Sequence, residues 1–135
     1  MTVNDFLTVP YVDGGRSLAG LDCWGQVRLA RAQLFNKDIA RSYGHILCAN
    51  KGGMTDAFIE MLPYFTEVAP KAGAIACCFR HNTLLHVGLV VEDQGLKVLH
   101  TNAKRGGHLL SLSAFTRLAL DVRYFDDSSN LNLPQ

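Results

Sequence analysis

The spacing of hydrophobic and polar positions changes about halfway along the chain. Over about residues 23–36, apolar residues recur every three or four positions and form one stripe: Val27, Leu29, Ala30, Leu34 and Phe35. Polar side chains occupy most of the positions between them, which predicts an amphipathic helix. Asp22 directly precedes this segment, and an aspartate there accepts hydrogen bonds from the free N–H groups of a helix start.

The next segment predicts a loop followed by a second helix. Polar residues and glycines over about 41–53 indicate a loop. A helix is expected over about residues 55–65, with Thr55 as its cap and Pro63 ending or kinking it. One face of this helix would carry Phe58, Ile59 and Leu62.

The second half of the chain is typical of short strands separated by turns. Strands are expected at 74–79, 85–91, 96–101, 109–112 and 120–125, with a short helix at 113–118 that Ser113 caps. Helices followed by a run of strands predict an α+β domain in which N-terminal helices pack on a small antiparallel β-sheet. We expect one domain over residues 1–125 and a polar C-terminal tail over residues 126–135.

Composition and charge limit the classes of partner that the protein is expected to bind. The chain has 135 residues, 48% of them hydrophobic, and a formal net charge of +1 from 13 Lys and Arg against 12 Asp and Glu. This balance argues against nucleic acid or an anionic membrane as the main partner. No apolar run approaches the roughly 20 residues of a membrane span, and the first residues do not resemble a secretory signal. Synthesis in the cytoplasm is therefore expected.

The four cysteines admit several interpretations. Without a signal peptide, a disulfide framework is the less favoured one. The adjacent Cys77 and Cys78 would point to opposite faces of a strand, so one of them is expected to be buried packing. His45 with Cys48 and Cys78 with His81 have spacings that zinc sites use. Because Cys78 closes an apolar strand and neither pair lies in a glycine-rich knuckle, no metal or other cofactor is expected.

Cys23 is the first residue of the predicted helix. A thiol at a helix start meets unpaired N–H groups and the positive end of the helix dipole, both of which favour the nucleophilic thiolate. The alternative is a buried cysteine that covers the helix end.

Two histidines lie on one predicted hairpin. If residues 93–95 form a three-residue loop, Glu92 opposes Leu96, and His86 and His100 share one face, a diagonal step apart. A two-residue loop would put them on opposite faces. A shared face is the arrangement that a general base and its orienting partner require.

These residues resemble a known family. Pro10-Tyr11 and Gly14-Gly15, followed by Asp22-Cys23-Trp24-Gly25, resemble the nucleophile motif of the NlpC-type cysteine peptidases, papain-like hydrolases of bacterial cell-wall peptides. His86-Val87-Gly88 resembles the histidine strand of that family, and Val98-Leu99-His100 its third catalytic position. The resemblance covers about residues 8–125. Ala74 departs from it, since an acidic residue is usual there, and residues 37–70 match no part of it.

The resemblance implies roles for individual residues. Cys23 would be the nucleophile, His86 the base and His100 the residue that orients His86. The hydroxyl of Tyr11, with the Cys23 backbone N–H, would stabilise the oxyanion; the alternative for Tyr11 is packing beneath the glycine turn. Trp24 would be a lid against the sheet or a wall of the cleft.

Basic residues in loops flank the expected site. Arg16, Lys104 and Arg105 could hold the carboxylates of a substrate, or they could be solvated loop charges.

The resemblance implies a cysteine endopeptidase that hydrolyses amide bonds in peptidoglycan stem peptides with a Cys-His-His triad. Asp22-Cys23-Trp24-Gly25 together with Arg28 is closest to the phage and prophage tail-associated branch, which implies association with a virion tail or delivery to the cell wall, and tail-tip proteins as further partners. Two alternatives stay open. One is an acyltransferase or deamidase on the same fold, and the other is a non-enzymatic tail assembly module.

Overall fold

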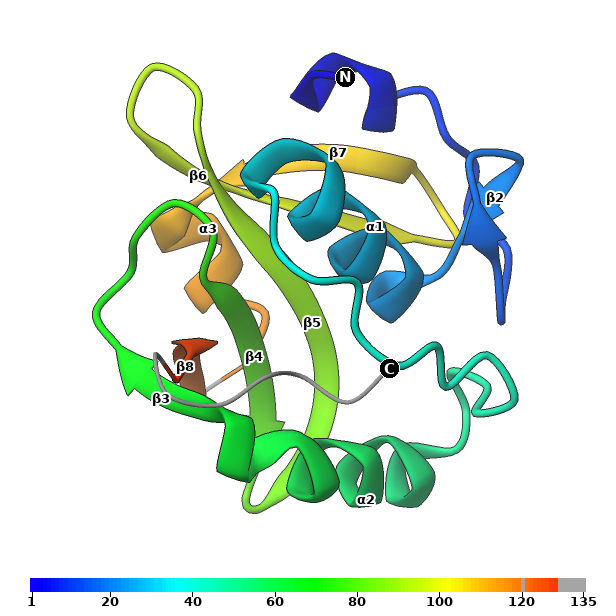
Figure 1. Cartoon of the computed structure of the whole chain (residues 1–135), viewed down its shortest axis with the longest axis vertical. Helices are drawn as coiled ribbons and strands as arrows, with labels where there is room; N and C mark the ends of the chain where they lie inside the picture. The colour runs from blue at the N-terminus through cyan, green and yellow to red at the C-terminus, as the bar shows by residue number, and fades with distance from the viewer. Residues whose placement is uncertain (120, 129–135) are drawn as a thin grey trace.

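The computed structural model describes residues 1–119 and 121–128 of the chain (Figure 1). In chain order its elements are η1 (Val3–Phe6), β1 (Arg16–Ser17), β2 (Gly20–Leu21), α1 (Cys23–Phe35), α2 (Lys51–Met61), η2 (Leu62–Tyr64), β3 (Phe65–Val68), β4 (Ile75–Arg80), β5 (Thr83–Glu92), β6 (Leu96–Asn102), β7 (Gly106–Ser111), α3 (Leu112–Thr116) and β8 (Asp121–Asp127). Here η denotes a 3-10 helix. The predicted α+β class with an antiparallel sheet is confirmed.

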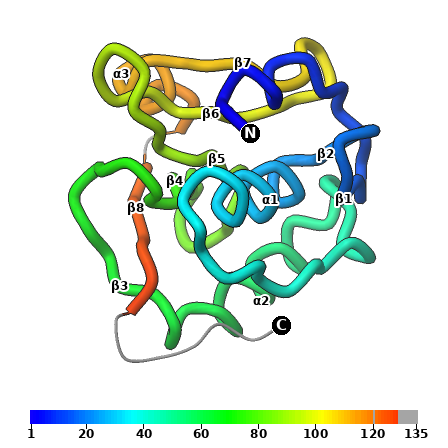
Figure 2. The backbone as a smooth tube through the Cα atoms, turned by 45° about the horizontal axis from the view of Figure 1, so that its top comes forward, coloured from blue at the N-terminus to red at the C-terminus, as the bar shows by residue number. Residues whose placement is uncertain are grey.

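Six strands form the main sheet in the order β3-β8-β4-β5-β6-β7, and neighbouring strands run antiparallel. The short strands β1 and β2 form a separate ladder. Helix α1 lies on one face of the sheet and α3 on the other, and α2 packs near the end of β5 (Figure 2). The sheet therefore separates two layers of packing.

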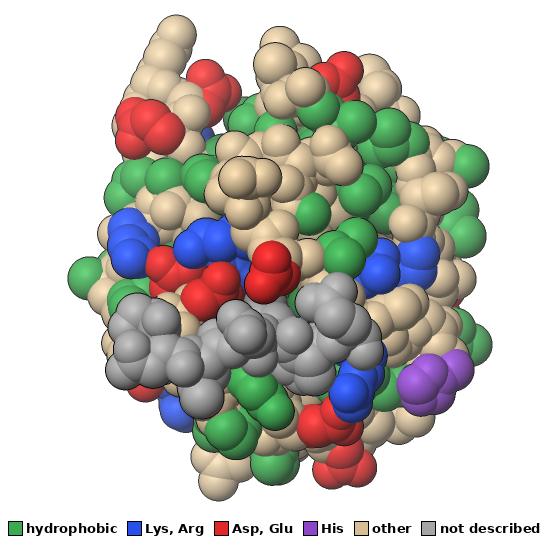
Figure 3. Space-filling model, in the orientation of Figure 1, with side chains coloured by type: hydrophobic (Ala, Val, Ile, Leu, Met, Phe, Trp, Pro, Cys, Tyr) green, Lys and Arg blue, Asp and Glu red, His purple; other side chains and the backbone are tan. Residues whose placement is uncertain are grey.

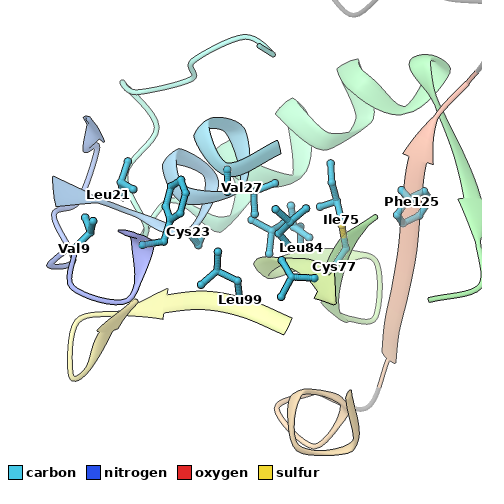
Figure 4. Packing of buried hydrophobic residues seen from close by; sticks show 14 of the residues in the cluster. Val9, Leu21, Cys23, Val27, Ile75, Cys77, Leu84, Leu99 and Phe125 are labelled. Carbon is cyan, nitrogen blue, oxygen red and sulfur yellow. The ribbon is translucent and has the colours of Figure 1, made fainter. Parts of the chain in front are cut away.

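Each face of the sheet has its own hydrophobic cluster. On the α1 side the cluster extends from Val9, Leu21 and Cys23 at one end to Phe125 at the other (Figure 4). On the α3 side it gathers around Phe115, which is fully buried. Cys77 belongs to the first cluster and Cys78 to the second. The prediction that these neighbours point to opposite faces is confirmed, and both are buried.

Helix α2 begins four residues earlier than predicted. Its cap is Asn50, whose side chain accepts a hydrogen bond from Gly53 N at 2.9 Å, so the cap assigned to Thr55 was wrong. The Thr55 hydroxyl instead donates to the Lys51 carbonyl at 2.8 Å and accepts from Leu84 N at 3.0 Å. Thr55 therefore ties α2 to β5.

The inward face of α2 also differs from the prediction. Met54, Phe58 and Met61 pack inward at the i, i+4 and i+7 spacing, whereas Ile59 and Leu62 are 58% and 40% exposed. The pattern was ambiguous because apolar residues lie on both sides of Phe58, and only the packing of Phe58 against Phe79 and Phe125 settles which side is buried.

Two later element boundaries also differ from the prediction. The cap of α3 is Ser111, which accepts a hydrogen bond from Ala114 N at 3.1 Å, rather than Ser113. Strand β8 continues to Asp127, two residues beyond the expected domain boundary, and Asp126 forms an ion pair with the buried Arg31 at 3.2 Å. Residues 129–135 of the expected tail lie outside the described residues.

The surface agrees with the near-neutral composition. On the face shown in Figure 3, acidic and basic side chains lie next to one another. None of the helices within residues 1–119 and 121–128 is long and apolar enough to cross a membrane.

Candidate active site

The start of α1 is fixed by Asp22, as the sequence predicted. Its carboxylate accepts hydrogen bonds from Gly25 N at 2.8 Å and Gly14 N at 2.9 Å, and it forms an ion pair with Arg16 at 2.6 Å. Asp22 is 4% exposed, so these partners replace the water that the charge gives up on burial. Asp22 therefore caps the helix and positions Cys23, the next residue.

Arg16 is used within the protein. Besides the ion pair with Asp22, its guanidinium donates to the Gly15 carbonyl and to the Ser42 carbonyl, both at 2.7 Å. Gly25 lies against the same turn, where a Cβ atom on it would collide with the Gly15 carbonyl. Arg16 thus joins the loop before α1 to the loop after it.

The Cys23 thiol is buried against the sheet. The residue is 6% exposed, and its sulfur accepts a hydrogen bond from the backbone N–H of Val87. Burial raises the pKa of Cys23 to about 11, although the Val87 N–H and the charge of Lys51 act to lower it. The helix start favours thiolate, but the burial that the alternative interpretation of Cys23 expected outweighs that effect, and the resting thiol is neutral at pH 7.

His86 and His100 form the pair that the hairpin predicted. Nε2 of His86 lies 3.0 Å from Nδ1 of His100. Glu92 opposes Leu96, so the connecting loop has three residues, as the shared-face arrangement required. The rings are nearly perpendicular, with centroids 5.2 Å apart. The predicted contact between the two histidines is confirmed.

Both histidines are neutral at pH 7. Burial lowers the pKa of His86 to about 4, and the nearby positive charge of Lys51 contributes. Burial also lowers the pKa of His100 to about 3, with further contributions from His86 and His108. A neutral imidazole can accept a proton, so each ring has the protonation state that a base requires.

The Cys23 thiol contacts β5, the strand that carries His86, beyond the end of the β5–β6 ladder. The last residue pair of that ladder is Leu89 and Leu99. Beyond it, the N–H of Val87 binds the Cys23 sulfur. The thiol therefore lies one residue along the backbone from His86, although the ring of His86 packs on the α3 side, 6.0 Å from that of Phe115.

Tyr11 and Cys48, which lie in loops, and Lys51, the first residue of α2, surround the thiol. The Tyr11 hydroxyl is hydrogen-bonded to Cys48, and burial raises the pKa of Tyr11, with smaller contributions from Cys48 and Cys23. Lys51 donates to the Leu85 carbonyl at 2.8 Å and contacts the Cys48 sulfur at 3.5 Å. Tyr11 thus lies near Cys23.

Sequence reasoning did not identify Cys48 as a site residue and did not consider Lys51. The sequence signal for Lys51 was Asn50, a residue type that caps helices. A cap at Asn50 places Lys51 in the first turn of α2.

An apolar pocket adjoins the thiol. It is an empty space of about 730 Å³, its open mouth included, and its lining includes Cys23, Trp24, Cys48, Met54, Phe58 and Leu84. Trp24 donates its indole N–H to the Arg41 carbonyl at 2.9 Å, which fixes the ring as one wall of this pocket. Part of the lining comes from residues 37–70, the stretch that matched no family pattern.

The remaining candidates lie away from the pocket. Lys104 and Arg105 are exposed in the β6–β7 turn, where their N–H groups bind the Asn102 side chain. Within the described part of the chain, no group of His, Cys, Asp and Glu is arranged to hold a metal ion. Cys78 is instead packed in the core, opposite His86 on the neighbouring strand.

The structure is an α+β domain whose antiparallel sheet carries α1, with Cys23 at its start, on one face and the paired histidines on the adjacent strands β5 and β6. A solved structure with the same fold is the crystal structure of the NlpC/p60 domain of the peptidoglycan hydrolase SagA. The TM-score is 0.59 at 19% sequence identity, and the match covers 93% of this chain and 92% of that one. No protein-family model and no curated protein matches the sequence. The chain thus has the NlpC/p60 type of papain-like fold.

Proposed function

We propose that the protein is a cysteine peptidase that hydrolyses amide bonds in peptidoglycan stem peptides. The observation that carries the proposal is the His86–His100 contact of 3.0 Å on a strand whose next residue, Val87, holds the Cys23 sulfur. The substrate class is supported by the fold, which is similar to a domain of a peptidoglycan hydrolase.

The neutral resting pair favours general-base catalysis. In the proposed reaction the ring of His86, which packs on the α3 side in the free protein, turns toward Cys23, and Nδ1, the nitrogen that His100 does not occupy, takes the thiol proton as the sulfur attacks the scissile carbonyl carbon. His100 then stabilises the imidazolium and keeps its ring in place. The Cys23 backbone N–H at the start of α1, which has no partner within the helix, donates to the oxyanion, and the Tyr11 hydroxyl is the second donor.

Collapse of the tetrahedral intermediate breaks the C–N bond. His86 gives its proton to the leaving amine, and the acyl group stays on Cys23 as a thioester. Water then attacks the thioester with His86 again as base, and the free thiol and the new carboxylate are released. No oxidant, reductant or cofactor enters this sequence.

Digestion of purified muropeptides tests the activity. Wild type is expected to release new peptide fragments, detected by mass spectrometry, and Cys23→Ala is expected to release none. His45→Ala is the matched control, because His45 is exposed and outside the site. If wild type releases no new fragments, the proposed peptidase activity is ruled out.

The apolar pocket favours a second function, hydrolysis or transfer of an apolar acyl group by the same thiol. Cys23 lines this pocket, so a group bound in it would lie beside the thiol. Acyl thioesters of increasing chain length test this function. It predicts that the rate rises with chain length in wild type and not in Met54→Trp, which fills the pocket. A rate that does not depend on chain length in wild type would contradict it.

We also propose that the protein acts from a phage tail, with tail-tip proteins as its partners. The support is the resemblance of Asp22-Cys23-Trp24-Gly25 and Arg28 to the tail-associated branch. In the fold Arg28 is structural, because it donates to the Ala40 carbonyl at 2.7 Å. Peptide mass spectrometry of purified virions tests the proposal, which fails if the chain is absent from particles that carry intact tails.

A further inference from the structure

The second nitrogen of His100 is buried without a partner. His100 is 2% exposed, and within the described part of the chain its Nε2 makes no hydrogen bond. A buried N–H without an acceptor is costly, whereas a buried nitrogen lone pair without a donor is more easily tolerated. Which tautomer His100 adopts therefore depends on what its Nε2 meets.

The tautomer of His100 determines the tautomer of His86. A single hydrogen lies between Nε2 of His86 and Nδ1 of His100. If His86 carries it, His86 Nδ1 is free to accept the thiol proton, and neutral His100 must carry its own hydrogen on Nε2. If His100 carries it, neutral His86 is protonated on Nδ1 and cannot act as the base. Only the first arrangement serves the proposed reaction.

A third histidine, His108, contacts His100 directly. The two residues oppose each other across β6 and β7, and their ring centroids are 4.1 Å apart. Nδ1 of His108 lies 2.8 Å from the Gly106 carbonyl. Because a carbonyl only accepts, Nδ1 of His108 carries the hydrogen, and its Nε2 is left as an acceptor.

An apolar ring also packs against His100 on this face. Phe115 packs against the ring of His100 with a centroid distance of 5.5 Å and has no acceptor atom in its side chain. His108 is itself 8% exposed. The two unused nitrogens therefore belong to neighbouring rings in one buried stack.

We propose that His108 is a positioning residue that accepts the Nε2 hydrogen of His100 and thereby holds His86 in the tautomer that is competent as a base. This inference rests on the proposed function for its catalytic meaning, but the array of three histidines is a property of the free protein.

Nitrogen-15 NMR of the histidine rings tests the proposal without any substrate. The chain has five histidines, so each ring can be assigned through single substitutions. In wild type we expect the hydrogen on Nε2 of His86, on Nε2 of His100 and on Nδ1 of His108. Wild-type His86 protonated on Nδ1 would overturn the proposal.

Substitution of His108 provides the second arm. In His108→Phe the acceptor is gone, and His86 is expected to shift toward the Nδ1-protonated tautomer by roughly 5-fold to 150-fold, the range that a buried N–H without an acceptor corresponds to. His108→Gln keeps an acceptor oxygen and should restore the wild-type tautomer, and His45→Phe is the exposed control. An unchanged His86 tautomer in folded His108→Phe would overturn the proposal.

Activity gives a separate readout. His108→Phe should lower kcat about 10-fold to 100-fold with KM nearly unchanged, as expected for a residue that acts through a catalytic group. If wild type cleaves no muropeptide while the tautomers follow the expected pattern, the proposed function fails and the histidine array stands. If wild type cleaves muropeptides while His108→Phe keeps both its tautomers and its kcat, only the role of His108 fails.

Discussion

The buried histidine pair should make the protein sensitive to mild acid. Both His86 and His100 have a folded-state pKa well below the ordinary value of 6.5, because burial disfavours their charged forms. Below pH 6.5 the unfolded chain binds protons at these two rings and the folded protein does not. The free energy of unfolding therefore falls as the pH falls, from about 6.5 toward the folded-state pKa values of about 4 and about 3.

The magnitude follows from the size of the shift. At pH 5 the solution is about 1.5 pH units below the unfolded pKa, and each unit is worth about 1.4 kcal/mol per group. Each ring then contributes about 2 kcal/mol and the pair about 4 kcal/mol. A loss of that size is a large fraction of the 5–15 kcal/mol by which domains are usually stable.

Urea unfolding at pH 7 and at pH 5 measures this loss. Wild type should lose about 4 kcal/mol, whereas His86→Gln with His100→Gln should lose much less, because the groups that take up protons on unfolding are gone. His45→Gln, an exposed substitution, should behave like wild type. A wild-type difference below about 1 kcal/mol, or a double variant as acid-sensitive as wild type, would refute the burial argument.

Three further predictions concern the start of α1. Alkylation of Cys23 by iodoacetamide should be slow at pH 7 and should accelerate as the pH approaches the Cys23 pKa of about 11. Lys51→Met should slow the alkylation further, because it removes a charge that lowers this pKa. A wild-type pH profile of alkylation centred near pH 7 would contradict the neutral resting thiol. Asp22→Ala should lower the free energy of unfolding by about 3 kcal/mol, because it removes a helix cap and leaves the charge of Arg16 without its partner. Urea unfolding measures this loss, and a loss below about 1 kcal/mol would show that the cap contributes little. Tyr11→Phe should lower kcat for muropeptides about 100-fold with little effect on KM if its hydroxyl donates to the oxyanion, and an unchanged kcat would reduce Tyr11 to packing.

Local rules were enough to predict the parts of the site that local geometry determines. Asp22 caps α1 because a short carboxylate at that position reaches the free N–H groups of the first turn. His86 and His100 meet because a three-residue loop sets the register between Glu92 and Leu96. In both cases the residues that interact belong to one turn or one hairpin.

Contacts between distant segments could not be predicted in the same way. Cys48 and Lys51 reach the thiol because the loop after α1 folds back over it, and no periodicity in the sequence specifies that path. The direction of the Cys23 pKa could not be predicted for a related reason. The helix start is visible in the sequence, but the burial that outweighs it arises only when α1 packs against β5.

The central claim is that Cys23 forms a covalent acyl intermediate with His86 as the base. Wild type mixed briefly with a muropeptide and quenched in acid should carry an adduct with the mass of the acyl fragment. Peptide mapping should place the adduct on the segment that contains Cys23, and Cys23→Ala should carry none. Fragments released without any adduct at Cys23, or an adduct that persists in Cys23→Ala, would contradict the account.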